Sequence, residues 1–429
     1  MQSRFWVLSA RCSCPFKGKD HDLSNSPMSE NSQPSLSTTS SQIQKTQVSK
    51  ARISRARILT LAIFFLNGFA IANWAVRIPA LKAQIGISEG TLGLALLCVA
   101  IGSVGFMPIV GRAIAQRGSS QVTRAMGFAF PISMILLALP NSIWLWIPVL
   151  LFYGATNGGL DVAMNAQATT VEKHFGRPIL NSFHAFWSLG SLLGAGVGGL
   201  FARAEIIPSV HLGLIGVLEL VILTVITRQL LSGDADPNPQ SSGSVRPTLP
   251  LLLIALVAFS ALMCEGAIAD WSAVYLRDDL KTNAFYAALG LVFAQGSMAL
   301  FRFAGDSFTL RFGPSSLLRW GGALSATGLA FALLSGLPWA ALLGFACVGA
   351  GMSVIFPVTI SAVSRLPGVA SGAGIAWVAS FGYAGFLVGP PVIGFLAEWT
   401  SLRIGLTAVV VFNLLIVFLA GAVEQRHAN

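Results

Sequence analysis

Charged residues are scarce in this chain. Only 10% of its 429 residues are Asp, Glu, Lys or Arg, whereas 54% are hydrophobic. A soluble domain carries charge on about a quarter of its residues, so the composition excludes a soluble globular protein. Segments that lie in lipid must be helices or a closed barrel, because only these pair every backbone polar group internally. The apolar runs lack the period-two alternation of barrel strands, so we expect an all-α polytopic membrane protein.

The chain also lacks the residue patterns of several other protein classes. Its five cysteines have no paired spacing that would indicate a disulfide framework or a zinc site, and its five histidines are scattered. No G-x-x-x-x-G-K-S/T motif for nucleotide phosphates is present. We therefore predict no enzyme activity, no cofactor and no metal site. The net charge of +10 fits cytoplasmic loops rich in Lys and Arg, so we predict no nucleic-acid partner.

Twelve apolar runs are long enough to cross a bilayer as helices, which takes about 20 residues each. The predicted organisation is a disordered tail (1–55), a six-helix bundle (56–231), a polar linker rich in Pro and Gly (232–248), a second bundle (249–424) and a short tail (425–429). The runs lie at 57–77, 90–111, 122–140, 143–170, 180–202, 208–230, 250–276, 284–304, 316–336, 338–363, 369–396 and 403–423.

Lys and Arg concentrate in the connections on the same side as the N-terminus. By the positive-inside rule this bias places both termini in the cytoplasm. We expect a multi-pass protein of the bacterial inner membrane, with the lipid bilayer as its surroundings.

Sequence landmarks recur between the two halves. Residues 70–74 read A-I-A-N-W and residues 267–271 read A-I-A-D-W. Gly111 and Gly305 each precede an arginine at the same spacing, and the glycines of the fifth run recur in the eleventh. The near-constant interval predicts two homologous, parallel repeats of six helices. The small-xxx-small ridge of the fifth run predicts close helix packing.

Two loops carry a family resemblance. The stretch Gly111-Arg-Ala-Ile-Ala-Gln-Arg117-Gly118 resembles the loop signature of the major facilitator superfamily, from which it departs at Ala115 and Gln116, and residues 302–313 are a fuller match. The likeness covers residues 56–424. It implies alternating access, with a substrate site near the midplane lined by the first, fourth, seventh and tenth runs. The motif D-V-A-M-N at 161–165 is similar to a bacterial branch that includes the rhizopine-locus membrane protein and is distantly related to fucose-type sugar:proton symporters.

The resemblance also implies latches between the halves at the cytoplasmic helix ends. The alternative is that these residues only anchor the helix ends on the cytoplasmic side by the positive-inside rule, which would not explain the acidic residue among them. The expected gating residues are Gly111, Arg117, Arg302, Gly305, Asp306 and Arg311.

Three polar residues share one face of the fourth run. Asn157, Asp161 and Asn165 recur every four residues, so they stack along a helix. An Asp at the bilayer centre costs about 3 kcal/mol, so this face must meet protein or water. It predicts a polar wall of a translocation cavity in which Asp161 exchanges protons. The alternative is a buried hydrogen-bond clamp to a neighbouring helix.

The seventh run carries two carboxylates. Glu265 and Asp270 are five residues apart, about 140° around a helix, so we expect at most one to point squarely into a central cavity. Glu265 lies deeper and is predicted to couple protons. Asp270 either lines the cavity or forms an interface ion pair with Arg77 or Arg277. Glu219 in the sixth run has no assigned role.

Other polar and aromatic residues lie near these carboxylates. His184 either approaches Asp161 or is satisfied by a backbone carbonyl, and a Trp can stack on a sugar ring or simply pack. The predicted substrate-binding residues are Asn67, Asn73, Trp74, Asn157, Asn165, His184, Trp271 and Gln295.

The favoured function is a monomeric, proton-coupled carrier of a small polar solute that resembles a sugar or polyol. A drug or metabolite exporter is the alternative, although Ala195 replaces the Pro of the exporter motif G-x-x-x-G-P-x-x-G-G. A non-transporting sensor or scaffold is a third interpretation.

Overall fold

A computed structural model describes residues 49–176, 179–231, 248–363, 366 and 371–424. Predictions for the first tail up to residue 48, for the linker at 232–247 and for residues 425–429 lie outside this range. The described residues form helices and no strands. Eleven of these helices are long and apolar enough to cross a membrane, which confirms the all-α polytopic class.

The first half of the chain begins with α1, which Ser49 caps. Its helices are α1 (Lys50–Ala75), α2 (Ile78–Ile85), α3 (Glu89–Arg117), α4 (Ser119–Leu136), α5 (Ile143–Phe175), α6 (Leu180–Arg203) and α7 (Pro208–Ile226), followed by the 3-10 turn η1 (Thr227–Gln229). Because α1 begins at Lys50, residues 50–55 are helical and do not belong to a disordered tail.

The second half repeats this pattern with more interruptions. It contains α8 (Leu249–Val274), the π-turn η3 (Tyr275–Asp279), α9 (Ala284–Phe312), α10 (Pro314–Ser335), α11 (Pro338–Met352), α12 (Ile355–Val363), α13 (Ser371–Trp399), α14 (Leu402–Gly405), α15 (Thr407–Leu419) and η4 (Ala420–Val423). The tenth run is therefore broken between Met352 and Ile355, where one continuous helix was expected. The third run is α4, a helix less apolar than the eleven candidate spans.

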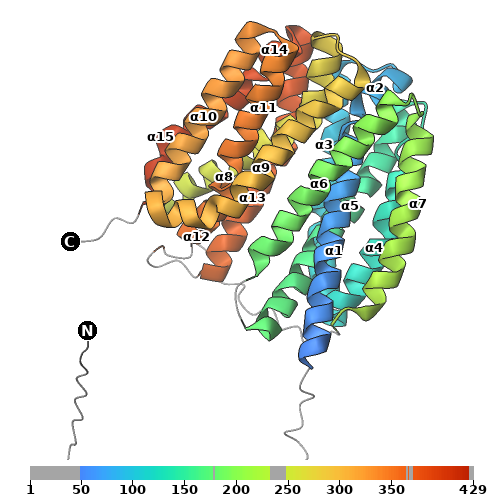
Figure 1. Cartoon of the computed structure of the whole chain (residues 1–429), viewed down its shortest axis with the longest axis vertical. Coiled ribbons are helices and arrows are strands. Elements are labelled where there is room, and N and C mark those ends of the chain that lie inside the picture. The colour runs from blue at the N-terminus through green and yellow to red at the C-terminus, as the bar shows by residue number, and fades with distance from the viewer. Residues whose placement is uncertain (1–48, 177–178, 232–247, 364–365, 367–370, 425–429) are drawn as a thin grey trace, which may run out of the picture. The chain divides into compact units, whose positions relative to one another are not determined.

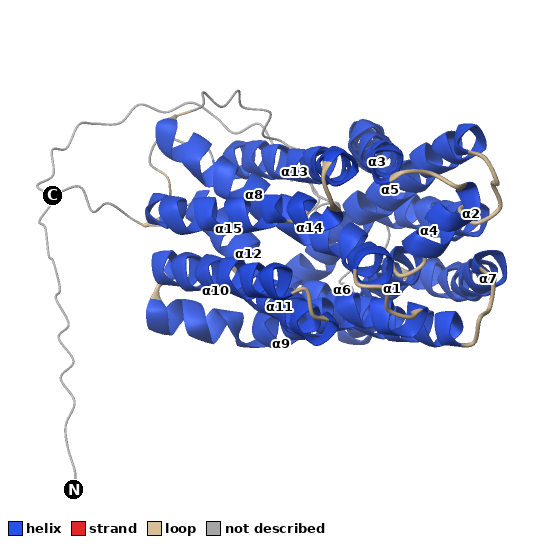
Figure 2. Ribbon diagram, turned by 90° about the horizontal axis from the view of Figure 1, so that it is seen from above, coloured by secondary structure: helices blue, strands red, loops and turns tan. Residues whose placement is uncertain are grey.

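Two bundles lie side by side in Figures 1 and 2. In the first, α1 packs on α6, α3 on α5, and α4 between α5 and α7; in the second, α8 packs on α13 and α10 on both α11 and α15. The bundles meet along two helix pairs, α6 with α9 and α3 with α13. This arrangement confirms two repeats of six membrane-spanning segments.

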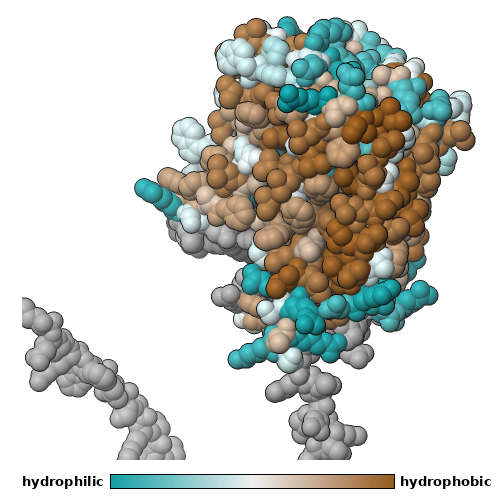
Figure 3. Space-filling model, turned by 45° about the vertical axis from the view of Figure 1, so that its right-hand side comes forward, coloured by the Kyte–Doolittle hydropathy of each residue, from teal (hydrophilic) through white to brown (hydrophobic). Residues whose placement is uncertain are grey.

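On the face shown in Figure 3, a band of apolar side chains lies between two hydrophilic ends. Large exposed members include Leu200, Leu334 and Phe418. Trp144 and Trp399 are also exposed and lie at helix ends, a position that suits an indole at a membrane interface. Such a band is the surface that hydrocarbon tails would cover.

Glycines bring α1 and α6 into backbone contact. A Cβ added to Gly190 would lie 2.0 Å from the carbonyl oxygen of Phe65, and one added to Gly194 would lie 2.2 Å from that of Phe69. No side chain fits at such distances, so the glycine ridge is a packing surface, as in other membrane helix pairs.

We expect Gly190→Ala to lower the free energy of unfolding by about 1–3 kcal/mol, because the added methyl group forces two backbones apart. Gly196→Ala is the matched control on the same helix, since a Cβ there meets nothing within 4 Å. The control is expected to gain about 0.5–1 kcal/mol from the helix preference of Ala. The measurement is the melting temperature of each variant in detergent, and equal values for the two variants would contradict the packing role.

Candidate functional site

A cavity of about 1000 Å³ lies between the two bundles. Its wall contains residues of α1, α3, α5 and α6 on one side and of α8, α9, α12 and α13 on the other. Trp74 and Asp270 line it toward the end of the molecule that carries α2, which we call the α2 end. At the opposite end, where α1 begins, the wall reaches Leu180, Pro314 and Val423 at the tips of their elements. The cavity therefore opens at the end where α1 begins.

Polar contacts close the α2 end. Lys82 of α2 forms ion pairs with Glu89 of α3 at 2.5 Å and with Asp278 beyond α8 at 2.7 Å. The Ser88 hydroxyl donates to Glu398 of α13 at 2.9 Å. Burial alone would lower the pKa of Lys82, but its hydrogen bonds to Asp278 and Glu89 outweigh burial and raise that pKa, so the amine is charged at neutral pH. We call this group the α2-end seal.

Helices of the two bundles also pack closely at the α2 end. A Cβ added to Gly93 of α3 would lie 2.7 Å from the carbonyl oxygen of Pro390 in α13, and one added to Gly199 of α6 would lie 2.9 Å from the Cβ of Ala288 in α9. Both contacts join one bundle to the other, so the cavity has no wide opening on this side.

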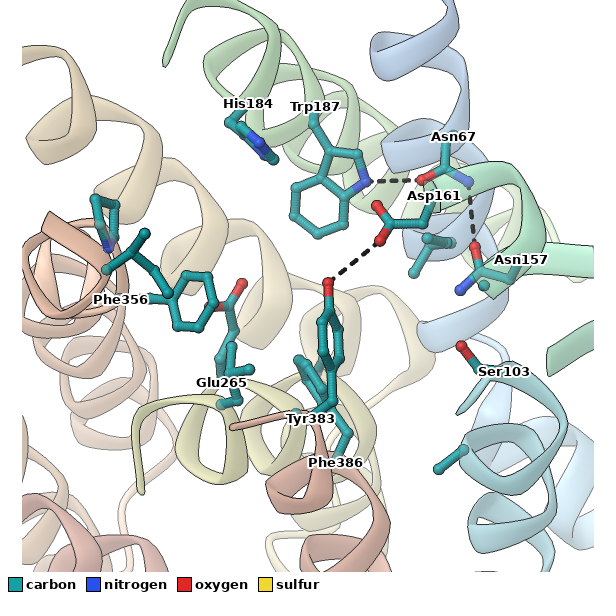
Figure 4. A pocket seen from close by; sticks show the side chains of 18 of the residues that line it. Asn67, Ser103, Asn157, Asp161, His184, Trp187, Glu265, Phe356, Tyr383 and Phe386 are labelled. Carbon is teal, nitrogen blue, oxygen red and sulfur yellow. Dashed lines mark hydrogen bonds between the residues drawn. The ribbon is translucent and has the colours of Figure 1, made fainter. Parts of the chain in front are cut away.

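A hydrogen-bond chain fixes two carboxamides in the cavity wall (Figure 4). The Trp187 Nε1 donates to Asn67 Oδ1 at 2.9 Å, and Asn67 Nδ2 donates to Asn157 Oδ1 at 3.1 Å. The chain links α6, α1 and α5 within the first bundle. Asn67 and Asn157 line the cavity, where the sequence placed them, and Trp187 is held by its indole nitrogen.

Asp161 connects the two bundles. Its Oδ2 accepts a hydrogen bond from the Tyr383 hydroxyl of α13 at 3.2 Å, and its Oδ1 accepts one from Asn165 Nδ2 at 3.1 Å. Asn165 also donates to the Asp161 carbonyl oxygen at 2.8 Å and does not line the cavity. Asn165 therefore holds the carboxylate in place, a correction to its expected contact with substrate.

Arg302 lies inside the cavity and makes three contacts. Its Nη2 is 3.5 Å from Glu265 Oε2, its Nη1 donates to the Ser188 hydroxyl of α6 at 2.7 Å, and its Nε donates to the Ser353 carbonyl at 3.3 Å. Ser353 lies at the break between α11 and α12, so the guanidinium satisfies a carbonyl that the helix leaves free. The prediction that Arg302 lies at a helix end was wrong, because α9 continues to Phe312.

Glu265 and Asp270 both line the cavity, which for Asp270 is the first of its two expected alternatives. The cavity wraps widely around α8, since Leu262, Gly266 and Ala269 line it as well. Asp270 forms no ion pair with any described residue. Arg77, one of its expected partners, instead donates to the backbone carbonyl of Ile206.

Other predicted binding residues divide into two groups. Trp74, His184 and Gln295 line the cavity, whereas Asn73 and Trp271 do not. Asn73 faces its own bundle, where its Oδ1 lies 2.8 Å from His211 Nε2 and its Nδ2 donates to the Phe69 carbonyl. Trp271 is fully buried. The expected contact of Asn73 and Trp271 with substrate was therefore wrong, because each lies on a side of its helix that faces away from the cavity.

His184 does not pair with Asp161. Its ring forms a T-shaped contact with Phe64 at a centroid distance of 5.4 Å, and it is an exposed residue that lines the cavity. Among the described residues, the His184 ring therefore forms neither of the two expected hydrogen bonds, to Asp161 or to a backbone carbonyl.

The predicted gating residues lie near the open end. Gly305 lines the cavity, Arg117 and Arg311 are exposed, and Gly111 is partly buried. Only the backbone of Asp306 lies within the described part of the chain. No described member of this group other than Arg302 bonds across the bundles, so a latch role stays a prediction.

Sequence reasoning missed Tyr153 of α5. Tyr153 and Gln295 both line the cavity, and the Tyr153 hydroxyl and the Gln295 Oε1 are buried without a hydrogen-bond partner among the described residues. A lone Tyr in an apolar run was the available signal. Polar atoms without a partner can form hydrogen bonds with a polar solute, and Trp74 lines the same cavity as these two residues. The described residues contain no group of three or more His, Cys, Asp or Glu that could hold a metal ion.

Comparison with known proteins gives a consistent family. The model of the Major Facilitator Superfamily matches residues 60–309. The chain is 34% identical to the uncharacterized transporter y4wD of Sinorhizobium fredii, over 84% of this chain and 96% of the relative, and 30% identical to membrane protein MosC of Rhizobium meliloti, over 85% and 89%. The E. coli fucose:proton symporter FucP shares the fold, with a TM-score of 0.57, 17% identity, and coverage of 86% of this chain and 98% of that structure. The chain therefore belongs to the Major Facilitator Superfamily, a family of membrane transporters and not of enzymes.

Proposed function

We propose that this protein moves a small polyol- or sugar-like solute across the membrane by alternating access, coupled to protons. The observation that carries the proposal is the cavity between the bundles, which is sealed at the α2 end and open at the other. If the N-terminus lies in the cytoplasm, as the Lys and Arg distribution predicts, this arrangement faces inward. Rocking of the bundles about the site would open the α2 end in its turn.

The chemistry of the wall supports a neutral, hydroxyl-rich solute. The amides of Asn157 and Gln295 and the hydroxyl of Tyr153 offer both donors and acceptors, and Trp74 offers an aromatic face. The volume of about 1000 Å³ is at the upper end for a small-molecule site, as an open cavity requires. The likeness in fold to a fucose:proton symporter agrees with this class of solute.

Asp161 is our proposed proton carrier. Its partners are a hydroxyl and a carboxamide, so it can take up a proton without losing an ion pair. Glu265, which the sequence favoured for this role, forms an ion pair with Arg302 that a proton carrier at this position would have to break. Since Tyr383 belongs to the other bundle, protonation of Asp161 also changes a contact between the bundles.

The test is a melting-temperature screen of the purified protein against sugars, inositols and amino sugars on one side and hydrophobic cations on the other. A ligand that binds only the folded state at 100 times its Kd adds about 2.7 kcal/mol of stability. We expect a polyol or sugar to raise the melting temperature, and the same compound to drive counterflow in proteoliposomes. Stabilisation by hydrophobic cations alone would overturn the proposal in favour of an exporter.

A further inference from the structure

The hydrogen-bond chain along the wall of the first bundle has a direction. Its members are Trp187 of α6, Asn67 of α1 and Asn157 of α5, joined at 2.9 Å and 3.1 Å. An indole nitrogen can only donate, so the Asn67 atom that faces Trp187 must be its oxygen. The Asn67 nitrogen then faces Asn157, and the atom that it meets there must be the Asn157 oxygen. The Trp187 indole therefore sets the orientation of both carboxamides.

Asn157 consequently presents its nitrogen to the cavity. The Asn157 Nδ2 donates to no described residue, and Figure 4 shows it pointing away from Asn67, toward the space between the bundles. Asn157 is only partly buried and lines the cavity. Asn67 differs, because just 2% of it is exposed and both ends of its carboxamide are bonded within the chain. The donor that this group offers to a solute is thus Asn157.

Close helix packing holds these side chains in place. A Cβ added to Gly68, beside Asn67, would lie 2.2 Å from the Trp187 carbonyl oxygen. One added to Gly158, beside Asn157, would lie 2.1 Å from a serine hydroxyl of α3. The helices that carry the chain therefore have little room to shift. A donor that is fixed before the solute arrives loses little entropy on binding.

The Trp187 ring supplies the second part of the site. Trp187 lines the cavity, and Figure 4 shows its ring extending from α6 into the space between the bundles. Because the indole nitrogen is bonded to Asn67, the ring keeps one orientation. Its apolar surface is then available to the C–H face of a sugar ring or polyol.

We propose that Asn157 is the donor that recognises an acceptor oxygen of the solute, and that Asn67 and Trp187 are positioning residues that fix the direction of this donor. The inference rests on the proposed function and adds a requirement that the solute must meet. A hydroxyl or ring oxygen can accept from Asn157. A group that only donates, such as an ammonium, would leave the amide without a partner and is selected against at this position.

The first experiment compares D-glucose with analogues in which each hydroxyl in turn is replaced by hydrogen or by fluorine. Fluorine can accept a hydrogen bond weakly but cannot donate one. At the position that faces Asn157, we expect the deoxy analogue to bind about 10-fold more weakly than D-glucose, and the fluoro analogue only about 3-fold more weakly. Where the protein accepts instead, both analogues should lose the bond alike. The measurement is the Kd by calorimetry with the purified protein in nanodiscs, and myo-inositol with its analogues is the second probe set.

Trp187→Phe tests the positioning role. It keeps an aromatic ring but removes the N–H that orients the chain, so Asn157 can turn either way although it is itself unchanged. We expect the fluoro and deoxy analogues then to bind within about 2-fold of each other. Trp377→Phe is the matched control and should keep the wild-type preference, since Trp377 is also partly buried but lies outside the cavity wall. Should Trp187→Phe not fold, Asn67→Leu removes the same link with a side chain of similar size.

A second measurement needs no solute. In protein labelled with ¹⁵N-asparagine, the side-chain amide signal of Asn157 is identified by its loss in Asn157→Leu. Trp187→Phe is expected to shift this nuclear magnetic resonance signal, because the carboxamides are no longer held in one direction. Trp377→Phe is expected to leave the signal in place.

Two results would overturn the inference. If the fluoro analogues bind as weakly as the deoxy analogues at every position, Asn157 donates to no solute oxygen. If the Asn157 signal is the same in Trp187→Phe as in wild type, the indole does not orient the chain. Failure of both D-glucose and myo-inositol to bind at all would instead overturn the proposed solute class, and with it the donor role, whereas the amide signal would still decide the positioning role.

Discussion

Asp161→Asn is expected to abolish accumulation of solute driven by a pH gradient, leaving only equilibration across the membrane. The Asn side chain can still accept the hydrogen bond from Tyr383 but cannot take up a proton. The measurement is uptake in proteoliposomes, with and without an imposed pH gradient, of the compound found in the melting-temperature screen.

Exchange of solute needs no net proton movement, so Asp161→Asn should retain it. Glu205→Gln is the control for loss of one carboxylate, since Glu205 is exposed and lies outside the cavity. Gradient-driven accumulation at the wild-type level in Asp161→Asn would remove this residue from the mechanism.

Arg302→Met is expected to abolish transport and to lower the free energy of unfolding by about 3 kcal/mol. It removes three contacts at once and leaves the Glu265 carboxylate without its cation. The expected loss is at the lower end of the range for breaking a buried pair, because the two side chains keep 18% and 16% of their surface exposed.

A double-mutant cycle separates the ion pair from the other two contacts. We expect Glu265→Gln with Arg302→Met to recover part of the stability but not the transport, since the link to Ser188 in the other bundle stays absent. Arg302→Lys keeps the charge but cannot reach three acceptors in one plane, so it should transport poorly. Wild-type transport by Arg302→Met would show that the contacts are only structural.

The fold could be predicted from the sequence because a lipid environment strongly restricts which structures an apolar segment can form. A run of about 20 apolar residues has few alternatives to a membrane helix, and the repeat supplied the pairing of the halves. The spacing of Asn157 and Asp161 predicted their shared face for the same reason, since a charged stripe cannot meet hydrocarbon.

Features that depend on tertiary contact were not predictable in this way. Arg302 was assigned to a helix end because the apolar run stops there, yet the helix continues within the protein. Asn73 and Trp271 lie close to cavity residues in sequence, but the rotation of their helices turns them away. The bond between Asp161 and Tyr383 joins residues of different bundles, which no local pattern reveals.

The α2-end seal has an energetic consequence for turnover. A carrier that visits two orientations must keep their free energies within a few kcal/mol, or one of them would hardly be populated. The side chains of Lys82, Glu89 and Asp278 in this seal remain 13–32% exposed, and ion pairs near water contribute only about 0–1 kcal/mol each. When the bundles part, water replaces each lost partner at little cost. If the proposed alternating access holds, an apolar seam of equal area would make the state closed at the α2 end a long-lived trap, whereas these ion pairs would let that state open again quickly.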